Sequence, residues 1–428
     1  MPARNCTGWP TTKMGLPWSS MEQHPPRQPE TDLVNSRALR TFGGAPARVV
    51  IAGGGVAGLE AMLALRALAQ ERVWIDLVAP TRDFVYRPLS ILEPFDRKTP
   101  RFDLSEIVLD HGARHYIDAV AEVDTDRHRL RTRAGKDIGY DALIVATGTR
   151  AHEAIPGALT FGADVSGESF AVLVDELEHG LVRHVVFALP GGVAWSLPLY
   201  ELALNAASTL RARDVNDVEL TIVTPEDAPL GVFGTRAAEA VRERLEEAGI
   251  RLMTATHPVA VELSGLRVVP HGYVHADRVI ALPRLEGLPP AGLPRDDAGF
   301  ISTDEHGQVE GITDVYAAGD ATTFPIKQGG MAAAQADAVA EAIAARSGAP
   351  VTPNPFRPVL RGMLFAGDGD IYLSAQITRG PAIDSPVGAE PLSWPPPKIS
   401  ARYLAPYLSE YGARLQRSES RTDRAALR

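Results

Sequence analysis

The sequence of 428 residues predicts an α/β protein with two parallel sheets, and three observations support this class. Short apolar runs typical of buried strands alternate with longer runs that have the periodicity of helices. This alternation occurs twice, around residues 48–79 and again around 184–256. The composition, with 45% hydrophobic and 22% charged residues, is that of a globular chain long enough for more than one hydrophobic core.

The first alternation contains a glycine-rich turn in a specific context. A predicted strand at 48–53 runs directly into Gly53-x-Gly55-x-x-Gly58, which opens a predicted helix at 56–70, and a second strand follows at 73–79. This spacing allows a tight turn and a close approach of the backbone to a pyrophosphate, and the helix N-terminus adds partial positive charge. The sequence therefore predicts a dinucleotide site at this turn.

The second alternation has a turn that departs from this pattern. In ALPGGVAWSLPLYE (188–201) the glycines are compressed to positions 191 and 192, and two prolines remove backbone donors that a pyrophosphate would use. Trp195 in this loop either covers a cofactor or packs between domains. Thr224 ends the second strand, where an acid would select NADH and an arginine NADPH, so neither nucleotide is specified. The predicted strands are 184–189, 218–224, 250–256 and 275–283, and the predicted helices are 197–211 and 235–248.

Two further motifs accompany the first turn, namely YDALIVATG at 140–148 and TDVYAAGD at 313–320. Together the three motifs resemble the two-dinucleotide-binding-domain flavoproteins of the pyridine nucleotide-disulfide oxidoreductase superfamily, over residues 47–347. Within it the chain is most similar to the type II NADH:quinone and sulfide:quinone oxidoreductase group, but it lacks the redox cysteines of that superfamily. The resemblance implies two Rossmann-like dinucleotide-binding domains, one for FAD and one NAD(P)-like, plus a small C-terminal segment.

The resemblance also implies a domain order. The FAD-binding domain is expected in two parts, at 47–150 and 286–347, with the NAD(P)-binding-like domain at 151–285 between them. Residues 1–46 have no long apolar run and are predicted to be a disordered tail, and residues 348–428 form the C-terminal segment.

The resemblance implies that FAD is the cofactor, with NADH or NADPH as an open choice of co-substrate. Asp320 would bind the ribityl chain, and an Asp that follows an apolar strand and a Gly is also, on its chemistry alone, an acceptor for sugar hydroxyls. Pro88, in DFVYRPL (83–89), would lie beside the flavin ring. The predicted FAD-binding residues are Gly53, Gly55, Val56, Ala57, Gly58, Arg87, Pro88, Val120, Ala146, Thr147, Gly148, Gly319, Asp320, Lys327 and Gln328.

Two residues are predicted to act in catalysis. Lys327 precedes a helix that starts on Gly329-Gly330, and in the resembled family this helix points at the side of the flavin where negative charge collects on reduction. The alternative for Lys327 is a solvated loop lysine. Glu201 stands where relatives that use a nicotinamide carry a glutamate after their second glycine-rich turn.

Several classes of function are not expected. The formal charge of −10 repels nucleic acid. The sole cysteine, Cys6, lies in the predicted tail, so neither sulfide nor disulfide chemistry is expected at the flavin. His111 and His115 have helical spacing but no further ligand nearby, so no metal site is predicted.

The sequence contains no apolar stretch of spanning length, which predicts a cytoplasmic protein, with peripheral membrane contact and homo-oligomerisation left open. Tyr403, Tyr407 and Tyr411 share one helical face in a segment similar to the quinone-side segment of the resembled group. This face would contact a membrane, the protein's own surface or a second subunit.

We therefore predict an FAD-dependent oxidoreductase that passes electrons from NAD(P)H through flavin to a quinone or similar small-molecule acceptor. One alternative is the direct oxidation of a small organic substrate without nicotinamide. Another is a flavoprotein whose degenerate donor site serves in assembly or binding.

Overall fold

The computed structural model describes residues 42, 45–95, 97–162, 167–193, 195–367, 369–377, 387–388 and 398–414. The chain divides into two units, Met1–Arg40 and Thr41–Arg428, and the elements named below belong to the second. The predicted N-terminal tail, apart from residues 42, 45 and 46, lies outside the described residues. Among the described residues, no helix has the length and apolar character needed to cross a membrane.

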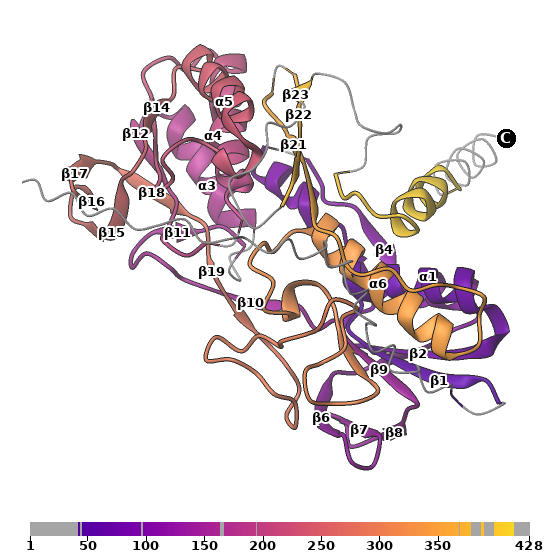
Figure 1. Ribbon diagram of the computed structural model, residues 1–428. Helices are drawn as coiled ribbons and strands as arrows, with labels where there is room; N and C mark the ends of the chain where they lie inside the picture. The colour runs from indigo at the N-terminus through magenta and orange to yellow at the C-terminus, as the bar shows by residue number, and fades with distance from the viewer. Residues whose placement is uncertain are drawn as a thin grey trace, which may run out of the picture. The chain divides into compact units, whose positions relative to one another are not determined.

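The first sheet has five parallel strands in the order β20-β9-β1-β2-β5, and Figure 1 labels β1, β2 and β9 of it beside helices α1 and α6. Helices α1 (Val56–Ala69) and α6 (Gly329–Arg346) pack together on one face, where an apolar cluster joins them to the strands. A second apolar cluster covers the other face. The strands are β1 (Ala47–Ala52), β2 (Val73–Ala79), β5 (Arg114–Ile117), β9 (Ala142–Val145) and β20 (Val315–Ala317).

The second sheet is also parallel, in the order β11-β18-β12-β13-β14. Helices α3 (Gly167–Glu178), α4 (Leu197–Ala212) and α5 (Thr235–Glu247) contribute to the apolar cluster on one face. In the first sheet the chain begins at the middle strand β1, moves outward through β2 and β5, and then returns to β9 and β20 on the other side. The second sheet repeats this order from β12 outward to β13 and β14 and back to β18, and β11 adds an edge strand beside β18. This is the Rossmann pattern and confirms the predicted fold class. The strands are β11 (Leu159–Thr160), β12 (His184–Ala188), β13 (Glu219–Val223), β14 (Arg251–Met253) and β18 (Arg278–Ala281).

Smaller elements connect or cover the two sheets. The antiparallel pair of β10 (Thr149–His152) and β19 (Arg284–Gly287) links the two parallel-sheet regions in sequence, and helix α2 is Leu104–Asp110. The other strands are β3 (Asp83–Val85), β4 (Arg101–Asp103), β6 (Val120–Asp124), β7 (Arg129–Thr132), β8 (Asp137–Gly139), β15 (His257–Glu262), β16 (Gly265–Val269), β17 (Gly272–His275), β21 (Val359–Leu364), β22 (Ile371–Gln376) and β23 (Val387–Gly388); the short 3-10 helices are η1 (Gln70–Arg72), η2 (Arg87–Phe95), η3 (Gly231–Phe233) and η4 (Gly319–Ala321).

The strand predicted at 275–283 is present but shorter, as β18 at Arg278–Ala281. Strand β17 ends at His275 and β18 begins at Arg278. Between them, the Asp277 carboxylate accepts hydrogen bonds from the backbone N–H groups of Arg183 and His184, at 2.8 and 2.9 Å. This carboxylate fixes the corner between the β15-β16-β17 sheet and the second parallel sheet.

The tyrosine face of the C-terminal helix packs on the protein itself. Residues 404–414 are helical. The Tyr407 hydroxyl donates to Asp110 of α2 at 3.1 Å, and the Tyr411 hydroxyl donates to Glu106 of the same helix. Of the predicted alternatives for the tyrosine face, packing on the protein's own surface is therefore the one observed. Residues 394–397, which precede this helix in the segment that is similar to the quinone-side segment of the resembled group, lie outside the described residues.

Candidate functional site

The carboxyl ends of three neighbouring strands bring the predicted FAD motifs together. Gly53 follows β1, residues 146–148 follow β9, and Gly319-Asp320 follows β20. The chain leaves β1 in one direction along the sheet and β9 lies on its other side, so this edge is a topological switch point. Ligands of open α/β sheets bind at such a point.

The first glycine-rich turn fits only glycine at two positions. Gly53 has a φ of 120°, and a Cβ atom there would lie 2.1 Å from the backbone oxygen of Ala146. A Cβ atom on Gly58 would lie 1.9 Å from the backbone oxygen of Gly53. The turn is thus pressed against both the β9 motif and its own helix, which places Val56 and Ala57 at the N-terminus of α1.

Asp320 is held beside this turn by a residue of α6. The backbone N–H of Gly319 donates to the Gln335 side chain at 2.7 Å, and a Cβ atom on Gly319 would lie 2.9 Å from the Cβ of Ala57. Burial raises the pKa of Asp320, while the charges of Lys327 and Arg87 act in the opposite direction. Gln335, a weaker candidate on sequence grounds than Lys327, is therefore a positioning residue for Asp320.

These residues fit a dinucleotide such as FAD. A Cβ atom on Gly55 would have no protein atom within 4 Å, so the turn leaves open space on that side. The Thr147 hydroxyl is buried and has no hydrogen-bond partner within the described part of the chain. Asp320 is half-buried at the start of η4 and offers acceptors for hydroxyl groups. The assignment of each residue, Gly148 included, to a cofactor contact stays a prediction.

Lys327 lies in a buried position close to Asp320, which favours a specific role over a solvated loop lysine. It is 8% exposed, its ammonium donates to the backbone oxygen of Thr322, and its Nζ lies 3.9 Å from the centre of the Phe300 ring. Burial lowers the pKa of Lys327 to about 8, although the Asp320 carboxylate opposes this effect. A cation that titrates near neutral pH beside a cofactor pocket is a functional candidate.

Gln328 is the N-cap of α6. Its side-chain oxygen accepts from the Met331 N–H at 3.0 Å, and its side-chain nitrogen donates to the Arg361 oxygen of β21 at 3.0 Å. Arg87 and Pro88 open η2, with Arg87 exposed. Val120 begins β6 and packs against the apolar cluster on the far face of the first sheet.

Glu201 is buried in α4 and is paired with a lysine that sequence reasoning missed. The Lys398 ammonium donates to the Glu201 carboxylate and to the Met363 backbone oxygen, and the Phe365 N–H donates to the same carboxylate at 2.9 Å. Burial raises the pKa of Glu201 and lowers that of Lys398, and their mutual attraction opposes both shifts. The pair ties α4 to the C-terminal segment, and the catalytic role of Glu201 stays a prediction.

Trp195, in the loop after β12, packs onto its own domain. Trp195 packs edge-on against Phe233 with ring centres 5.8 Å apart, inside the apolar cluster of the second sheet. The observed partner belongs to the same domain as Trp195, so this contact is not the predicted packing between domains, and the covering of a cofactor by Trp195 stays a prediction. Helix α4 then begins at Leu197, with Ser196 as N-cap.

Glu226 is a further charged group at this end of the second sheet. Its carboxylate accepts from the Ser196 hydroxyl at 2.9 Å, from the Thr224 hydroxyl at 3.0 Å and from the Tyr200 hydroxyl. The carboxylate is therefore fixed at the N-terminus of α4. The segment TIVTPED contains Glu226, but this acid stands two residues after Thr224, the position where an acid that selects NADH was expected.

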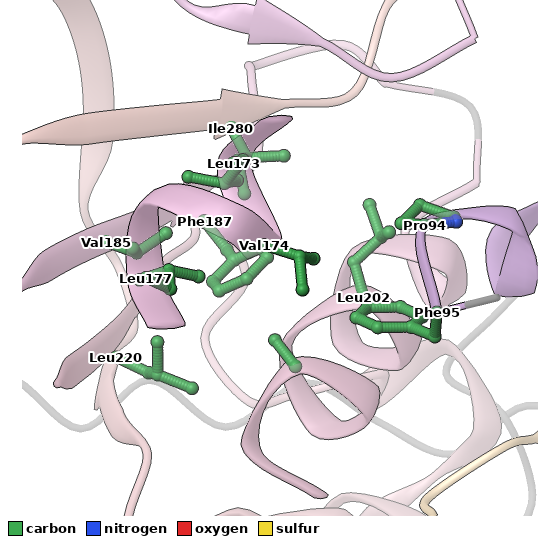
Figure 2. A pocket seen from close by; sticks show the side chains of 11 residues that line it. Pro94, Phe95, Leu173, Val174, Leu177, Val185, Phe187, Leu202, Leu220 and Ile280 are labelled. Carbon is green, nitrogen blue, oxygen red and sulfur yellow. The ribbon is translucent and has the colours of Figure 1, made fainter. Parts of the chain in front are cut away.

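An apolar pocket lies between η2 and the helix-covered face of the second sheet. Figure 2 shows Phe95 of η2 beside Leu202 of α4, and Phe187 of β12 facing Leu177 of α3. Every residue that lines the pocket is apolar. A ligand site normally adds a few polar groups that fix orientation, so we assign this pocket to packing between η2 and the second sheet.

Comparison with known proteins identifies the family. Residues 47–342 match the pyridine nucleotide-disulphide oxidoreductase family, and the chain belongs to it. It is therefore an oxidoreductase with FAD as its cofactor. An NADH dehydrogenase-like protein of Mycobacterium tuberculosis is 27% identical over 295 residues, which are 64% of this chain and 72% of that protein.

Sulfide:quinone oxidoreductase of Aquifex aeolicus is similar in sequence and in fold. The sulfide-quinone reductase sequence from that organism is 28% identical over 225 residues, 46% of this chain and 47% of that protein. The crystal structure superposes with a TM-score of 0.71 at 21% identity and covers 80% of this chain and 86% of that one. At this identity the structural likeness establishes the fold alone.

Proposed function

We propose that this protein oxidises NADH at its FAD cofactor and passes the electrons to a quinone or similar small acceptor. The observation that carries the proposal is the buried Lys327 beside Asp320. This pair lies at the switch point, where the glycine-rich turn after β1 meets the motifs after β9 and β20. Bound FAD supplies hydride acceptance and electron transfer. The name of the mycobacterial relative supports a nicotinamide donor, and that of the Aquifex relative a quinone acceptor.

In this proposal the residues of the chain bind, orient and supply charge. Gly55 and the N-terminus of α1 receive the pyrophosphate, and Asp320 accepts hydrogen bonds from sugar hydroxyls. Lys327 and the N-terminus of α6 place positive charge where the site gains negative charge on reduction.

Glu226 supports NADH over NADPH as the donor. A carboxylate that follows the second strand of a Rossmann unit accepts hydrogen bonds from ribose hydroxyls and repels a 2′-phosphate. Glu226 follows β13 by three residues and is held by three hydroxyl groups, so its carboxylate is fixed in place. The sulfide chemistry of the Aquifex relative is not proposed, because residues 7–428 contain no cysteine.

The experiment mixes the purified flavoprotein anaerobically with NADH, NADPH or sulfide and follows the flavin absorbance. We expect bleaching within seconds with NADH, slower bleaching with NADPH and none with sulfide. Glu226→Gln should lower the ratio of the NADH rate to the NADPH rate by about tenfold, which corresponds to about 1.4 kcal/mol. Asp227→Asn, which changes the exposed neighbouring acid, is the matched control and should keep the ratio. Flavin that stays oxidised with both nucleotides contradicts the proposal.

A second function, direct oxidation of a small organic substrate, is favoured by the loop after β12. The prolines at 190 and 198 remove backbone donors that a pyrophosphate would use there. Under this alternative, an organic reductant bleaches the flavin while both nucleotides fail.

A further inference from the structure

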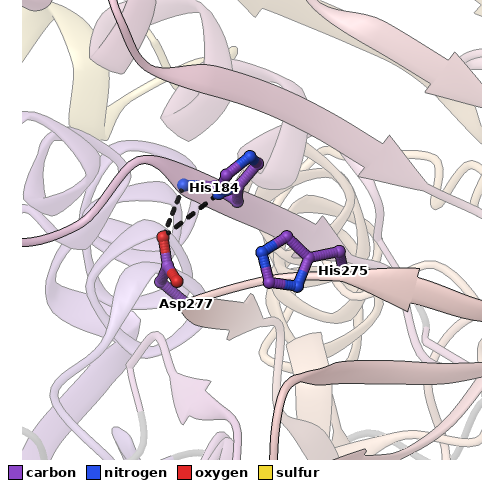
Figure 3. Close-up of side chains that lie close together, drawn as sticks. All are labelled: His184, His275 and Asp277. Atoms are coloured by element: carbon purple, nitrogen blue, oxygen red, sulfur yellow. Dashed lines mark hydrogen bonds and ion pairs between the residues drawn. The ribbon is translucent and has the colours of Figure 1, made fainter.

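Two histidines and an aspartate meet at the amino end of the second sheet, as Figure 3 shows. His184 is the first residue of β12, His275 is the last residue of β17, and Asp277 lies between β17 and β18. One ligand atom of each side chain lies within 4.8 Å of the other two. His184 and Asp277 are 93 residues apart in the chain, so no sequence motif reveals the group.

The His275 ring is held in the orientation of a metal ligand. Its Nδ1 lies 2.8 Å from the backbone oxygen of Ser264. A carbonyl oxygen only accepts hydrogen bonds, so Nδ1 carries the proton and Nε2 keeps a free lone pair. Histidines that bind metals in proteins are fixed by a hydrogen bond of this kind from the other ring nitrogen.

Asp277 is held in place by backbone groups and retains a free oxygen. Its Oδ2 accepts from the backbone N–H groups of Arg183 and His184, and His184 Nδ1 lies 3.3 Å from the same atom. All of these contacts go to Oδ2, so Oδ1 keeps its lone pairs within the part of the chain that the structure describes.

The two imidazole rings are close enough to share one ion. Their centres are 4.4 Å apart and their planes are tilted by 60°. Ligand atoms around an ion with bonds of about 2.0–2.2 Å lie roughly 3–4 Å from one another, so small side-chain rotations would complete the geometry. The site is at the surface, since His184 is partly exposed and His275 is exposed, so water has access to the remaining coordination positions.

We propose that His184, His275 and Asp277 bind one divalent transition-metal ion, with Zn²⁺ as the preferred ion and water as the remaining ligands. Two imidazole nitrogens and one carboxylate oxygen suit Zn²⁺ and do not suit Mg²⁺, which prefers an all-oxygen octahedron. The inference is independent of the proposed function, because the site lies at the amino ends of β12 and β18, whereas Gly191 and Glu226 follow the carboxyl ends of β12 and β13.

The bound ion would join two sheets. His275 belongs to the β15-β16-β17 sheet, which packs through an apolar cluster on the second parallel sheet, and His184 belongs to that parallel sheet. An ion between them cross-links segments that are distant in the chain, and an ion that binds only the folded state stabilises it.

The test uses the full-length flavoprotein, freed of metal with EDTA and desalted. Isothermal titration calorimetry with Zn²⁺ is expected to show one site per chain in this region, and titration with Mg²⁺ is expected to show none. His275→Ala should weaken Zn²⁺ binding by at least about tenfold, and Zn²⁺ should raise the unfolding temperature of the parent protein but not of this variant. His271→Ala removes an exposed histidine from the turn between β16 and β17 and should leave both measurements unchanged.

The comparison of His275→Ala with His271→Ala can also overturn the proposal. If His275→Ala binds Zn²⁺ as the parent does, or if His271→Ala weakens binding equally, the ion binds elsewhere or only adventitiously. Both exposed substitutions are expected to fold, and an unchanged flavin absorbance spectrum in each variant verifies this. An absence of Zn²⁺ heat in the parent overturns the proposal outright.

Discussion

Replacing Asp337 with asparagine is expected to stabilise the protein by an amount that grows with pH. Asp337 lies on α6 against Glu60 of α1, and the two carboxyl groups share a hydrogen bond. The Glu60 carboxylate accepts from the backbone N–H groups of Tyr403 and Leu404, at 2.8 and 2.6 Å, at the start of the C-terminal helix. Burial raises the pKa of Glu60, but these backbone donors oppose the rise, and within the described residues Asp337 has no such donors, so the shared proton resides on Asp337.

The size of the effect follows from the pKa of Asp337. Burial, and after it the charge of Glu60, raises this pKa from 3.8 to about 8. Below about pH 4 the carboxyl is protonated in both the folded and the unfolded chain, and the interaction contributes its full stability. As the pH rises from about 4 to about 8, the unfolded chain loses this proton and the folded chain keeps it, so the free energy of unfolding falls by about 1.4 kcal/mol per pH unit. At pH 7 the loss is about 4 kcal/mol as an upper bound.

Asparagine has nearly the same shape as protonated aspartate and donates to Glu60 without titrating. Urea unfolding at pH 5.5, 7.0 and 8.5, followed by circular dichroism with saturating FAD, measures the free energies of the parent and of Asp337→Asn. The gain in the variant should be smallest at pH 5.5 and largest at pH 8.5. Glu239→Gln, a change at an exposed carboxyl of α5, controls for the loss of one charge. A gain that is the same at all three pH values refutes the reasoning.

Three further predictions concern the cofactor region and the C-terminal segment. Lys398→Met leaves Glu201 buried without its cation and should lower the free energy of unfolding by about 3–5 kcal/mol. Adding Glu201→Gln to this variant should restore most of the lost stability, and a double variant as unstable as Lys398→Met alone would contradict the prediction. Lys327→Met should slow flavin reduction by NADH at least about tenfold in stopped-flow experiments. In the parent the rate of reduction should decline as the pH rises through about 8, and the variant should lack this decline. A variant with the pH profile of the parent would rule out this role. Gly55→Ala should change the stability of the FAD-free protein by less than about 0.5 kcal/mol but weaken FAD binding, measured by flavin fluorescence. Gly53→Ala should instead destabilise the protein itself. If Gly55→Ala binds FAD as tightly as the parent does, the placement of the cofactor is contradicted.

The sequence predicts those parts of the fold that depend on local pattern. The strands β1 and β2 and the helices α1, α4 and α5 lie within one or two residues of the predicted ranges, because alternating apolar runs and glycine turns act over short distances. The convergence of Gly53 and Asp320 was also predictable, since parallel strands end at a common edge. Lys398 and Glu226 were not predicted as site residues, because each acts through a tertiary contact that no spacing encodes.

The C-terminal segment shows why such contacts decide how the site is built. Lys398 pairs with Glu201 of α4, the Ile399 N–H donates to the Tyr86 hydroxyl at 3.0 Å, and the next turn is capped by Glu60 of α1. Two of these three anchors tie the segment to helices, α1 and α4, which begin at the glycine-rich turn of the first sheet and at the altered turn of the second. The third anchor is Tyr86, the residue between β3 and η2. Because Ile399 also packs against Gly329, at the N-terminus of α6, displacement of the segment would disturb the surroundings of Lys327. Loss of the Lys398 anchor should consequently alter flavin reactivity as well as stability, an effect that a purely local ion pair would not produce.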